Sequence, residues 1–273
     1  MSRKKAEQED DMHDDDEGKG LIFSRREAIE KAAAAGVLAL FGSGTARALT
    51  GQVGQDAPTP LEKTFLVVSP ELTEGPFFED EGLNRSDLLE GTTRSSVVDG
   101  LPFTLRLRLW ELNGTRGRPF KGAKVDLWHC DAIGVYSDEL NGGGFENTLG
   151  QKWLRGYQVS DKTGEVVFRT IWPGWYPGRT IHYHFKVRIQ VGGSTYDFTS
   201  QLFIDDVLND SVMANPPYSG RGNRSTRNSN DGIYRQRQAD NSRAGDRLLL
   251  TIKDDGKGGR VGTFDVAFDM DGL

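Results

Sequence analysis

The sequence predicts an all-β protein: a single antiparallel β-sandwich domain with long loops, preceded by a disordered, signal-bearing N-terminus. Three observations support this prediction. Apolar and polar residues alternate with a period of two in several segments, as they do in strands with one buried face. Turns rich in glycine separate these segments, and the chain contains 34 glycines. After residue 48, no long segment has the period of an amphipathic helix.

The first 48 residues are expected to lie outside the domain. Residues 1–23 form an acidic extension, which we expect to be disordered. Residues 24–48 have the layout of a twin-arginine signal peptide, with Arg25 and Arg26, an apolar run at 32–41 and small residues at 46–48. The alternative is an amphipathic helix with an incidental arginine pair. The apolar run is too short for a permanent membrane span, so we expect export to the periplasm or beyond without a stable membrane anchor.

Residues 49–64 read as a linker, and residues 65–273 as the main domain. Period-two alternation marks four strands, at 103–110, 123–128, 181–190 and 264–270.

Residues 205–247 are polar and show no such period, so we expect a long loop there. Five of its arginines are expected on a solvated face, with contact to a substrate or a neighbouring subunit as the alternative: Arg221, Arg224, Arg227, Arg235 and Arg237.

The segment 175–184 is the most informative part of the chain, because it holds two of the four histidines. His182 and His184 lie two apart on a predicted strand and therefore point to the same side. Their side of the strand is polar, and the sequence leaves open whether it is covered or exposed. Tyr176 precedes a Pro-Gly turn that can fold it back toward the histidines. Such a pair can hold one metal ion, although two satisfied polar residues are an equally good interpretation.

A second tyrosine lies in a similar setting. Tyr136 follows Gly134, where the chain reverses after the predicted strand at 123–128. Phenolate is a hard anionic oxygen donor, which suits ferric iron better than zinc or copper(I). Tyrosines near turns are more often packing residues with a solvated hydroxyl.

With these motifs, the chain resembles the intradiol ring-cleavage dioxygenases, the group of protocatechuate 3,4-dioxygenase and catechol 1,2-dioxygenase. Six blocks occur in the expected order, at 73–78, 128–137, 154–156, 168–179, 182–185 and 199–203. They extend over most of residues 65–272, and an ordered set is far more specific than any single block.

The resemblance implies a non-haem Fe(III) cofactor and a site for each ligand. Tyr136 and Tyr176 match the two tyrosinates, and His182 and His184 match the two imidazoles. Tyr176 also matches the tyrosinate that leaves the metal and takes up a proton. Arg179 matches the arginine beside the bound catechol.

Gln201 matches a glutamine near the same site, and residues 73–78 match a segment that lines it. The implied partners are a catechol-type molecule and O2. The implied reaction is cleavage between the two hydroxyl-bearing carbons, which gives a cis,cis-muconate-type diacid. Residues 65–273 then form the catalytic domain.

Two features depart from the family pattern. The interval from Tyr176 to His182 is shorter than in the best-known protocatechuate enzymes, so the resemblance does not define which residues form the rim of the pocket. Tyr183 stands where isoleucine is usual, which we interpret as a packing change. The particular catechol, and whether the chain forms a homo-oligomer, stay open.

Two other function classes remain. One is a secreted β-sandwich binding module without a catalytic metal. The other is an Fe(II) oxygenase with a carboxylate ligand, for which His129 and Asp131 are the candidates, although we expect both to be structural. The single cysteine, Cys130, excludes an internal disulfide and reads as a small buried residue. A net charge of −6 gives no support to nucleic-acid binding.

Overall fold

The structure is a computed structural model that describes residues 63–64, 68–141, 146–191 and 193–269. The predicted acidic extension and twin-arginine signal lie outside the described residues, as does the linker apart from its last two residues. Within the described residues, no helix is long and apolar enough to cross a membrane.

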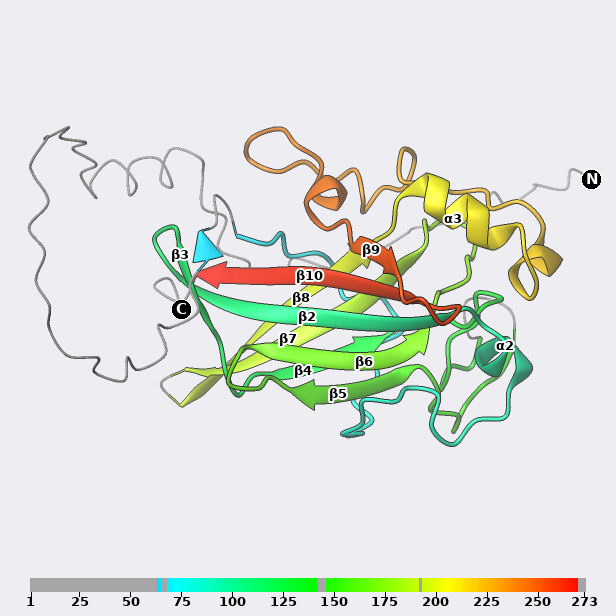
Figure 1. Cartoon of the computed structure of the whole chain (residues 1–273), viewed down its shortest axis with the longest axis horizontal. Coiled ribbons are helices and arrows are strands. Elements are labelled where there is room, and N and C mark those ends of the chain that lie inside the picture. Colours follow the sequence, from blue (N-terminus) through cyan, green and yellow to red (C-terminus); the bar gives the residue numbers. More distant parts are fainter. Residues whose placement is uncertain (1–62, 65–67, 142–145, 192, 270–273) are drawn as a thin grey trace, which may run out of the picture.

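Two β-sheets pack face to face and form the body of the protein (Figure 1). The larger sheet is six-stranded and contains β1 (Lys63–Thr64), β3 (Arg116–Pro119), β2 (Pro102–Asn113), β10 (Arg260–Asp269), β9 (Thr251–Asp254) and β6 (Glu165–Ile171). The smaller is four-stranded, in the order β5 (Arg155–Val159), β4 (Lys124–Trp128), β7 (His182–Val191) and β8 (Ser194–Phe203). The all-β sandwich expected from the sequence is confirmed.

One strand pair differs from the antiparallel expectation. β10 runs parallel to β2, from Arg260 opposite Phe103 to Asp269 opposite Leu112. The other strand pairs are antiparallel. A period of two reports which face of a strand is buried, but it carries no information about the direction of the neighbouring strand.

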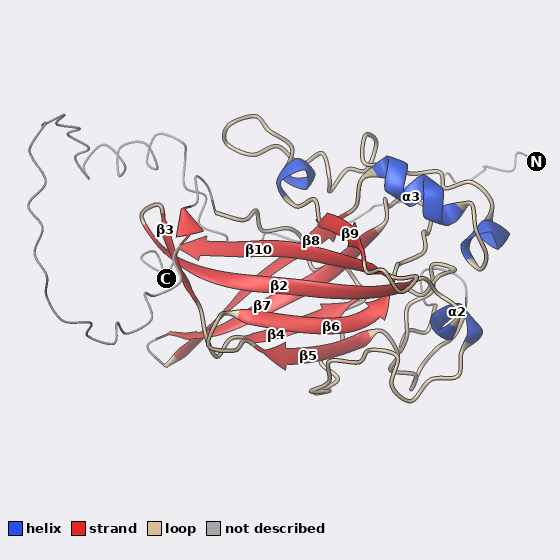
Figure 2. Ribbon diagram, viewed as in Figure 1, coloured by secondary structure: helices blue, strands red, loops and turns tan. Residues whose placement is uncertain are grey.

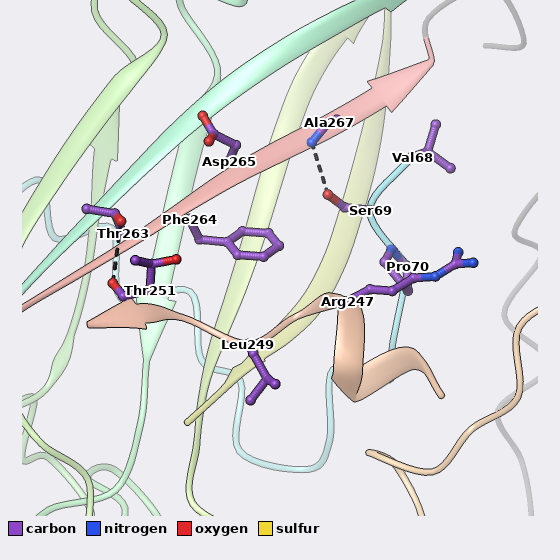
Figure 3. A pocket seen from close by; sticks show the side chains of 10 residues that line it. All are labelled: Val68, Ser69, Pro70, Arg247, Leu249, Thr251, Thr263, Phe264, Asp265 and Ala267. Carbon is purple, nitrogen blue, oxygen red and sulfur yellow. Dashed lines mark hydrogen bonds between the residues drawn. The ribbon is translucent and has the colours of Figure 1, made fainter. Parts of the chain in front are cut away.

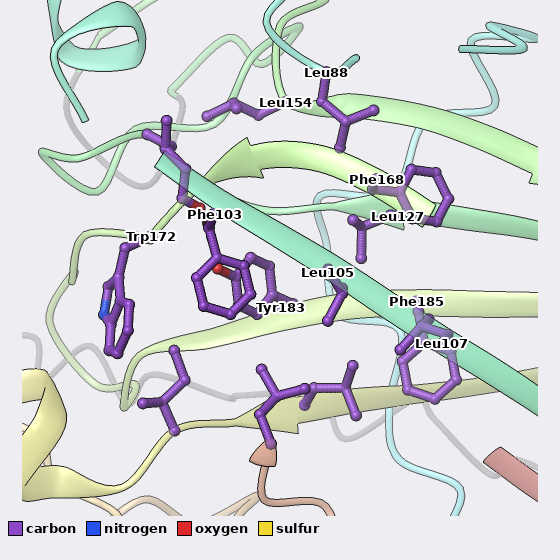
Figure 4. Packing of buried hydrophobic residues seen from close by; sticks show 14 of the residues in the cluster. Leu88, Phe103, Leu105, Leu107, Leu127, Leu154, Phe168, Trp172, Tyr183 and Phe185 are labelled. Atoms are coloured by element: carbon purple, nitrogen blue, oxygen red, sulfur yellow. Dashed lines mark hydrogen bonds between the residues drawn. The ribbon is translucent and has the colours of Figure 1, made fainter. Parts of the chain in front are cut away.

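The core fills the space between the sheets (Figure 4). Alternate residues of β2, among them Phe103, Leu105 and Leu107, are at most 1% exposed and face Tyr183 and Phe185 of β7. Each such side chain contributes about 1.5–3 kcal/mol when it is fully buried. This core fixes which face of β7 points inward, and it therefore sends the histidines of β7 to the opposite face.

A strap at residues 70–84 covers that opposite face. The strap begins beside β8, where Leu72 N donates to Thr199 O (3.0 Å), and ends beside β5, where Tyr157 N donates to Leu83 O (2.8 Å). Between these points, Lys186 of β7 pairs with Glu74 of the strap. The polar face of β7 is therefore covered, which the sequence left open.

Short helices and loops lie at the edges of the sandwich (Figure 2). They include α2 (Ser95–Val98), α3 (Asp206–Met213) and the 3-10 turns η2 (Tyr218–Arg221) and η3 (Ala244–Arg247). The sequence predicted a long loop at 205–247, but the segment contains α3, η2 and η3. α3 begins where the Asp205 side chain accepts from Val207 N (2.8 Å), but eight residues are too few for a clear helical period.

Arg224 corrects another expectation for this segment. Its side chain is buried and pairs with Asp206 and Asp210 of α3. A buried guanidinium needs partners for its charge, and here it joins the segment to the helix. The expected solvated face does not include Arg224.

Candidate metal centre

His182 and His184 lie at the start of β7 and are 2% and 1% exposed. Their Nε2 atoms are 2.9 Å apart, so both imidazoles are directed at one point. His182 Nδ1 is 2.6 Å from the carbonyl oxygen of Thr180. That contact requires a hydrogen on Nδ1, which leaves the Nε2 lone pair free for a metal ion. The ring of His184 is stacked on the ring of Trp128, with 5.0 Å between the ring centroids, and this packing fixes the plane of the imidazole.

Tyr176 reaches the histidines through the turn at Pro177 and Gly178. Gly178 has a φ of 89°, which favours glycine, and Arg179 N closes the turn on Tyr176 O at 3.5 Å. The hydroxyl oxygen of Tyr176 then lies 3.3 Å from His182 Nε2. The short interval between Tyr176 and His182 therefore suffices to bring the two side chains together.

Tyr136 comes from the loop after β4 and is fully buried. Its ring lies 5.7 Å from that of Tyr176 and 6.2 Å from that of His184. Its hydroxyl finds no hydrogen-bond partner within the described part of the chain. Proteins rarely leave a buried hydroxyl unpaired, so this atom points to a ligand that completes the site.

Two glycines let the tyrosine-bearing loops touch. A Cβ on Gly134 would lie 2.1 Å from the carbonyl oxygen of Trp175, and a Cβ on Gly174 would lie 2.4 Å from that of Ala132. Neither contact leaves room for a side chain. The close approach of these backbones places Tyr136 beside Tyr176.

The strap forms another wall of the centre. Phe77 stacks on Tyr136 at 4.3 Å and meets Tyr176 edge-on at 6.2 Å. A Cβ on Gly75 would be 3.3 Å from Cε1 of His184, so the strap backbone also passes close to the imidazole. The segment 73–78 therefore packs directly against three of the four candidate ligands.

Burial keeps all four side chains neutral in the absence of a cation. It raises the pKa of Tyr136 well above its usual value, and the neighbouring Tyr176 raises it further, while Arg179 opposes the shift. Burial raises the pKa of Tyr176 to about 12, again against Arg179. Burial lowers the pKa of His182 and of His184 far below the usual value, and the charge of Arg179 adds to both shifts.

The donor set fits a trivalent iron ion. Neutral imidazoles are ready ligands, and the two phenols become anionic donors when a cation displaces their protons. The unpaired hydroxyl of Tyr136 supports this fit, because a bound cation would give it the partner that it lacks. Phenolate oxygens are hard donors, which favours the ferric over the ferrous state.

Arg179 is close enough to the four candidate ligands to shift the pKa of each of them, and it is held from two sides. Its Nε donates to Asp231 (2.9 Å), and its Nη2 donates to Gln201. Gln201 in turn donates through Nε2 to Thr73 O (2.9 Å) and lies opposite His184 in the β7–β8 register. The structure therefore brings the six site residues predicted from the sequence into one cluster.

The alternative ligands His129 and Asp131 are occupied elsewhere. Both ring nitrogens of His129 are in hydrogen bonds, with Cys130 O (2.7 Å) and Thr170 Oγ1 (2.6 Å). Asp131 accepts from Arg94, from Ser96 Oγ and from two backbone amides. Among the described residues, no group of three histidine, cysteine, aspartate or glutamate side chains is placed to hold a metal. These two residues are structural, as expected.

Sequence reasoning missed Asp231 and Thr180. Asp231 comes from the segment 205–247, 52 residues away from Arg179 in the chain, and no local pattern links the two. The only available signal was the length of that polar segment.

A separate cavity of about 290 Å³ lies at the edge of the larger sheet, between β9, β10 and residues 68–70 (Figure 3). Its two charged lining residues are already engaged: Asp265 accepts from Trp110 Nε1 (2.6 Å), and Arg247 pairs with Asp240. None of the candidate ligands lines it.

Comparisons with known proteins agree with this geometry. A family model described as a dioxygenase matches residues 73–195. A solved intradiol ring-cleavage dioxygenase from Tetranychus urticae is 28% identical with a TM-score of 0.61, and the match covers 74% of this chain and 95% of that one. A dioxygenase domain from a carbohydrate-binding fusion protein of Streptomyces sp. SirexAA-E is 27% identical with a TM-score of 0.51, over 74% of this chain and 99% of that one.

A curated sequence relative is the catechol 1,2-dioxygenase of Candida albicans. It is 31% identical over 67 residues, which is 24% of this chain and 20% of that protein. The match therefore spans only a fifth of the curated relative.

The clustered histidines and tyrosines, together with the matching family model, identify the protein as a dioxygenase. More specifically, the chain is similar to intradiol ring-cleavage dioxygenases, among them the Tetranychus urticae enzyme and, over 67 residues, the curated catechol 1,2-dioxygenase.

Proposed function

We propose that the protein binds one non-haem Fe(III) through Tyr136, Tyr176, His182 and His184. With this cofactor it cleaves a catechol-type ring between the two hydroxyl-bearing carbons, using O2, to a cis,cis-muconate-type diacid. The observation that carries the proposal is the buried, unpaired hydroxyl of Tyr136 beside two converging imidazoles. Similarity to solved intradiol ring-cleavage dioxygenases supports the same reaction.

When bound, ferric iron would draw electron density from a catecholate and make its ring open to O2. The chain's own residues prepare the substrate for this step. A catechol that binds through both oxygens must lose two protons: Tyr176, as a phenolate, can accept one of them, and solvent hydroxide can take the other. Tyr176 is suited to this role because it is less buried than Tyr136 and is attached to a turn whose Pro177 and Gly178 are exposed.

Arg179 and Phe77 complete the site. The guanidinium carries a permanent charge next to all four ligands and can stabilise negative charge that develops on the ring. Phe77 covers Tyr136 and Tyr176, and its apolar ring keeps water from the reacting atoms. The arrangement therefore supports a catechol-type substrate.

The visible spectrum and iron content of the purified protein test the proposal. Phenolate bound to Fe(III) absorbs visible light by charge transfer, so we expect a red-brown protein with one iron per chain. Tyr136→Phe should change this band, and His182→Ala or His184→Ala should lose most of the iron.

Tyr183→Phe is the matched control for Tyr136→Phe. Tyr183 is equally buried but faces the core, where its hydroxyl donates to Ile171 O at 3.1 Å. It should keep both iron and colour. A colourless wild-type protein that stays inactive after iron reconstitution would contradict the proposal and favour a binding module.

We also propose that the protein is exported by the twin-arginine route. The proposal rests on Arg25, Arg26 and the apolar run that follows them. This route carries folded proteins, so iron could be loaded before export. Changing both arginines to lysine should hold the folded protein in the cytoplasm, and unimpeded export of that variant would refute the assignment.

A further inference from the structure

Asp231 is a fully buried carboxylate at the edge of the candidate metal centre. Its Oδ2 accepts from Arg179 Nε (2.9 Å) and from the backbone N of Thr180 (2.7 Å), and its Oδ1 accepts from Tyr234 N (2.8 Å). A buried charge is tolerated only with partners of this kind. Three donors therefore fix the carboxylate in one orientation.

The Asp231 carboxylate is linked both to Arg179 and to the metal-ligand candidate His182. Through Arg179 it reaches the group that stands beside all four ligands. Through Thr180 it reaches His182, because the carbonyl oxygen of Thr180 is the acceptor for His182 Nδ1 at 2.6 Å. One side chain from a distant segment thus holds two consecutive residues on the connection between Tyr176 and the first histidine.

Hydrogen bonds on two sides fix the orientation of the Arg179 guanidinium. Asp231 binds the Nε side, and Gln201 binds Nη2. Arginine side chains have many rotamers, and each hydrogen bond made by the planar fork removes some of them. With Nε paired to a buried charge, the remaining edge of Arg179 is presented to the centre in one geometry.

Other residues of the segment 205–247 also hold the part of it that carries Asp231. Asn228 also ties the loop to the site, since Thr180 Oγ1 donates to Asn228 Oδ1 (2.7 Å) and Asn228 Nδ2 donates to Ile204 O (2.9 Å). Arg224 joins the loop to α3. The pairing of Asp231 with Arg179 is therefore a contact in addition to those that dock the segment.

We propose that Asp231 is a positioning residue that acts through Arg179 and sets the direction of its guanidinium for turnover. The proposal rests on the proposed function, because it assigns how the loop at 226–235 contributes to that reaction. It predicts that Asp231 affects kcat and not the affinity of the protein for iron.

Asp231→Asn tests the proposal, since it keeps the shape, removes the charge and replaces one accepting oxygen with an NH2 donor. The expected result is wild-type iron content and colour, little change in the spectral titration with catechol, and a kcat lower by about 10- to 100-fold, the effect typical of a group that orients a functional side chain. Asp240→Asn is the matched control: Asp240 lies on the same segment and pairs with Arg247, away from the centre. It should turn over as the wild type does.

A double-mutant cycle separates positioning from a role in the fold. If Asp231 acts through Arg179, then Asp231→Asn should change kcat by less than about twofold when Arg179 is already alanine. A wild-type kcat in Asp231→Asn, or an equal loss in both backgrounds, would overturn the proposal.

Failure of the proposed function gives a different result, namely a wild-type protein without iron or catechol turnover. In that case the same cycle is read from melting temperatures. A smaller shift from Asp231→Asn in the Arg179→Ala background supports the link between the two side chains, and an equal shift in both backgrounds overturns it.

Discussion

The contact between the two tyrosine-bearing loops should depend on the absence of a side chain at Gly134. In Gly134→Ala, the added methyl carbon would lie 2.1 Å from the carbonyl oxygen of Trp175 and 2.9 Å from its carbonyl carbon. Both are backbone atoms, so they cannot rotate away. The φ of 86° adds strain for any residue with a Cβ. One of the loops must move, and Tyr136 or Tyr176 must move with it.

Gly150→Ala separates the clash from the backbone strain. Gly150 has a similar φ of 80°, but a Cβ there would meet no atom within 4 Å. Its alanine variant should therefore lose only the conformational term, about 1–2 kcal/mol. Gly134→Ala should lose this and the overpacking term, which is about 1–3 kcal/mol or more.

Thermal unfolding and iron analysis of the two variants check the prediction. A difference of about 2 kcal/mol corresponds to a melting temperature roughly 4–8 °C lower for Gly134→Ala than for Gly150→Ala. Gly134→Ala should also hold less iron, whereas Gly150→Ala should be fully loaded. Equal melting temperatures and full iron in both variants would refute the idea that this contact assembles the centre.

Three further predictions concern single side chains. Arg179→Ala should retain iron and colour but turn over about a hundredfold more slowly, the loss typical of one preorganised electrostatic donor; loss of iron would show that Arg179 holds the loop instead. Burial raises the pKa of Asp126 to about 6, although Arg188 and Lys124 oppose it. Because the folded state then binds this proton more tightly than the unfolded state, stability falls as pH rises from about 4 to 6. Asp126→Asn should therefore be more stable than wild type at pH 7, by at most about 3 kcal/mol at 1.36 kcal/mol per pKa unit, and should lose the advantage near pH 4, which melting curves at the two pH values can check. Finally, Cys130 is 3% exposed and burial raises the pKa of its thiol, so it should react with a thiol reagent only after unfolding, and rapid reaction in the native protein would contradict its buried placement.

Much of the fold could be predicted because each strand carries its own signal. The alternation at 103–110 and 181–190 reports one buried face, and it was enough to predict the sandwich. The parallel pairing of β10 with β2 could not be predicted, because strand direction depends on how the chain returns and not on any local period. α3 was missed because its eight residues, half of them polar, are too few for a clear periodic pattern.

In the candidate site, too, the residues with a local sequence signal could be predicted and those brought in by tertiary contacts could not. His182 and His184 were predictable because a strand fixes their spacing, and Tyr176 because a turn returns it to them. The covering of this face was expected only from the family resemblance of residues 73–78 and from no local pattern, since the strap at 70–84 comes from a distant part of the chain and is held by contacts such as Lys186 with Glu74. Asp231 was hidden for the same physical reason: its partner Arg179 is close only in the folded protein.

Turnover of catechol under 18O2 tests the central claim most directly, with the ring-opened product analysed by mass spectrometry. If Tyr136, Tyr176, His182 and His184 hold a ferric centre for intradiol cleavage, the product is a cis,cis-muconate-type diacid that carries both labelled atoms, and Tyr136→Phe forms it more slowly than Tyr183→Phe. A semialdehyde from cleavage outside the two hydroxyls, or a diacid without label, would contradict the account.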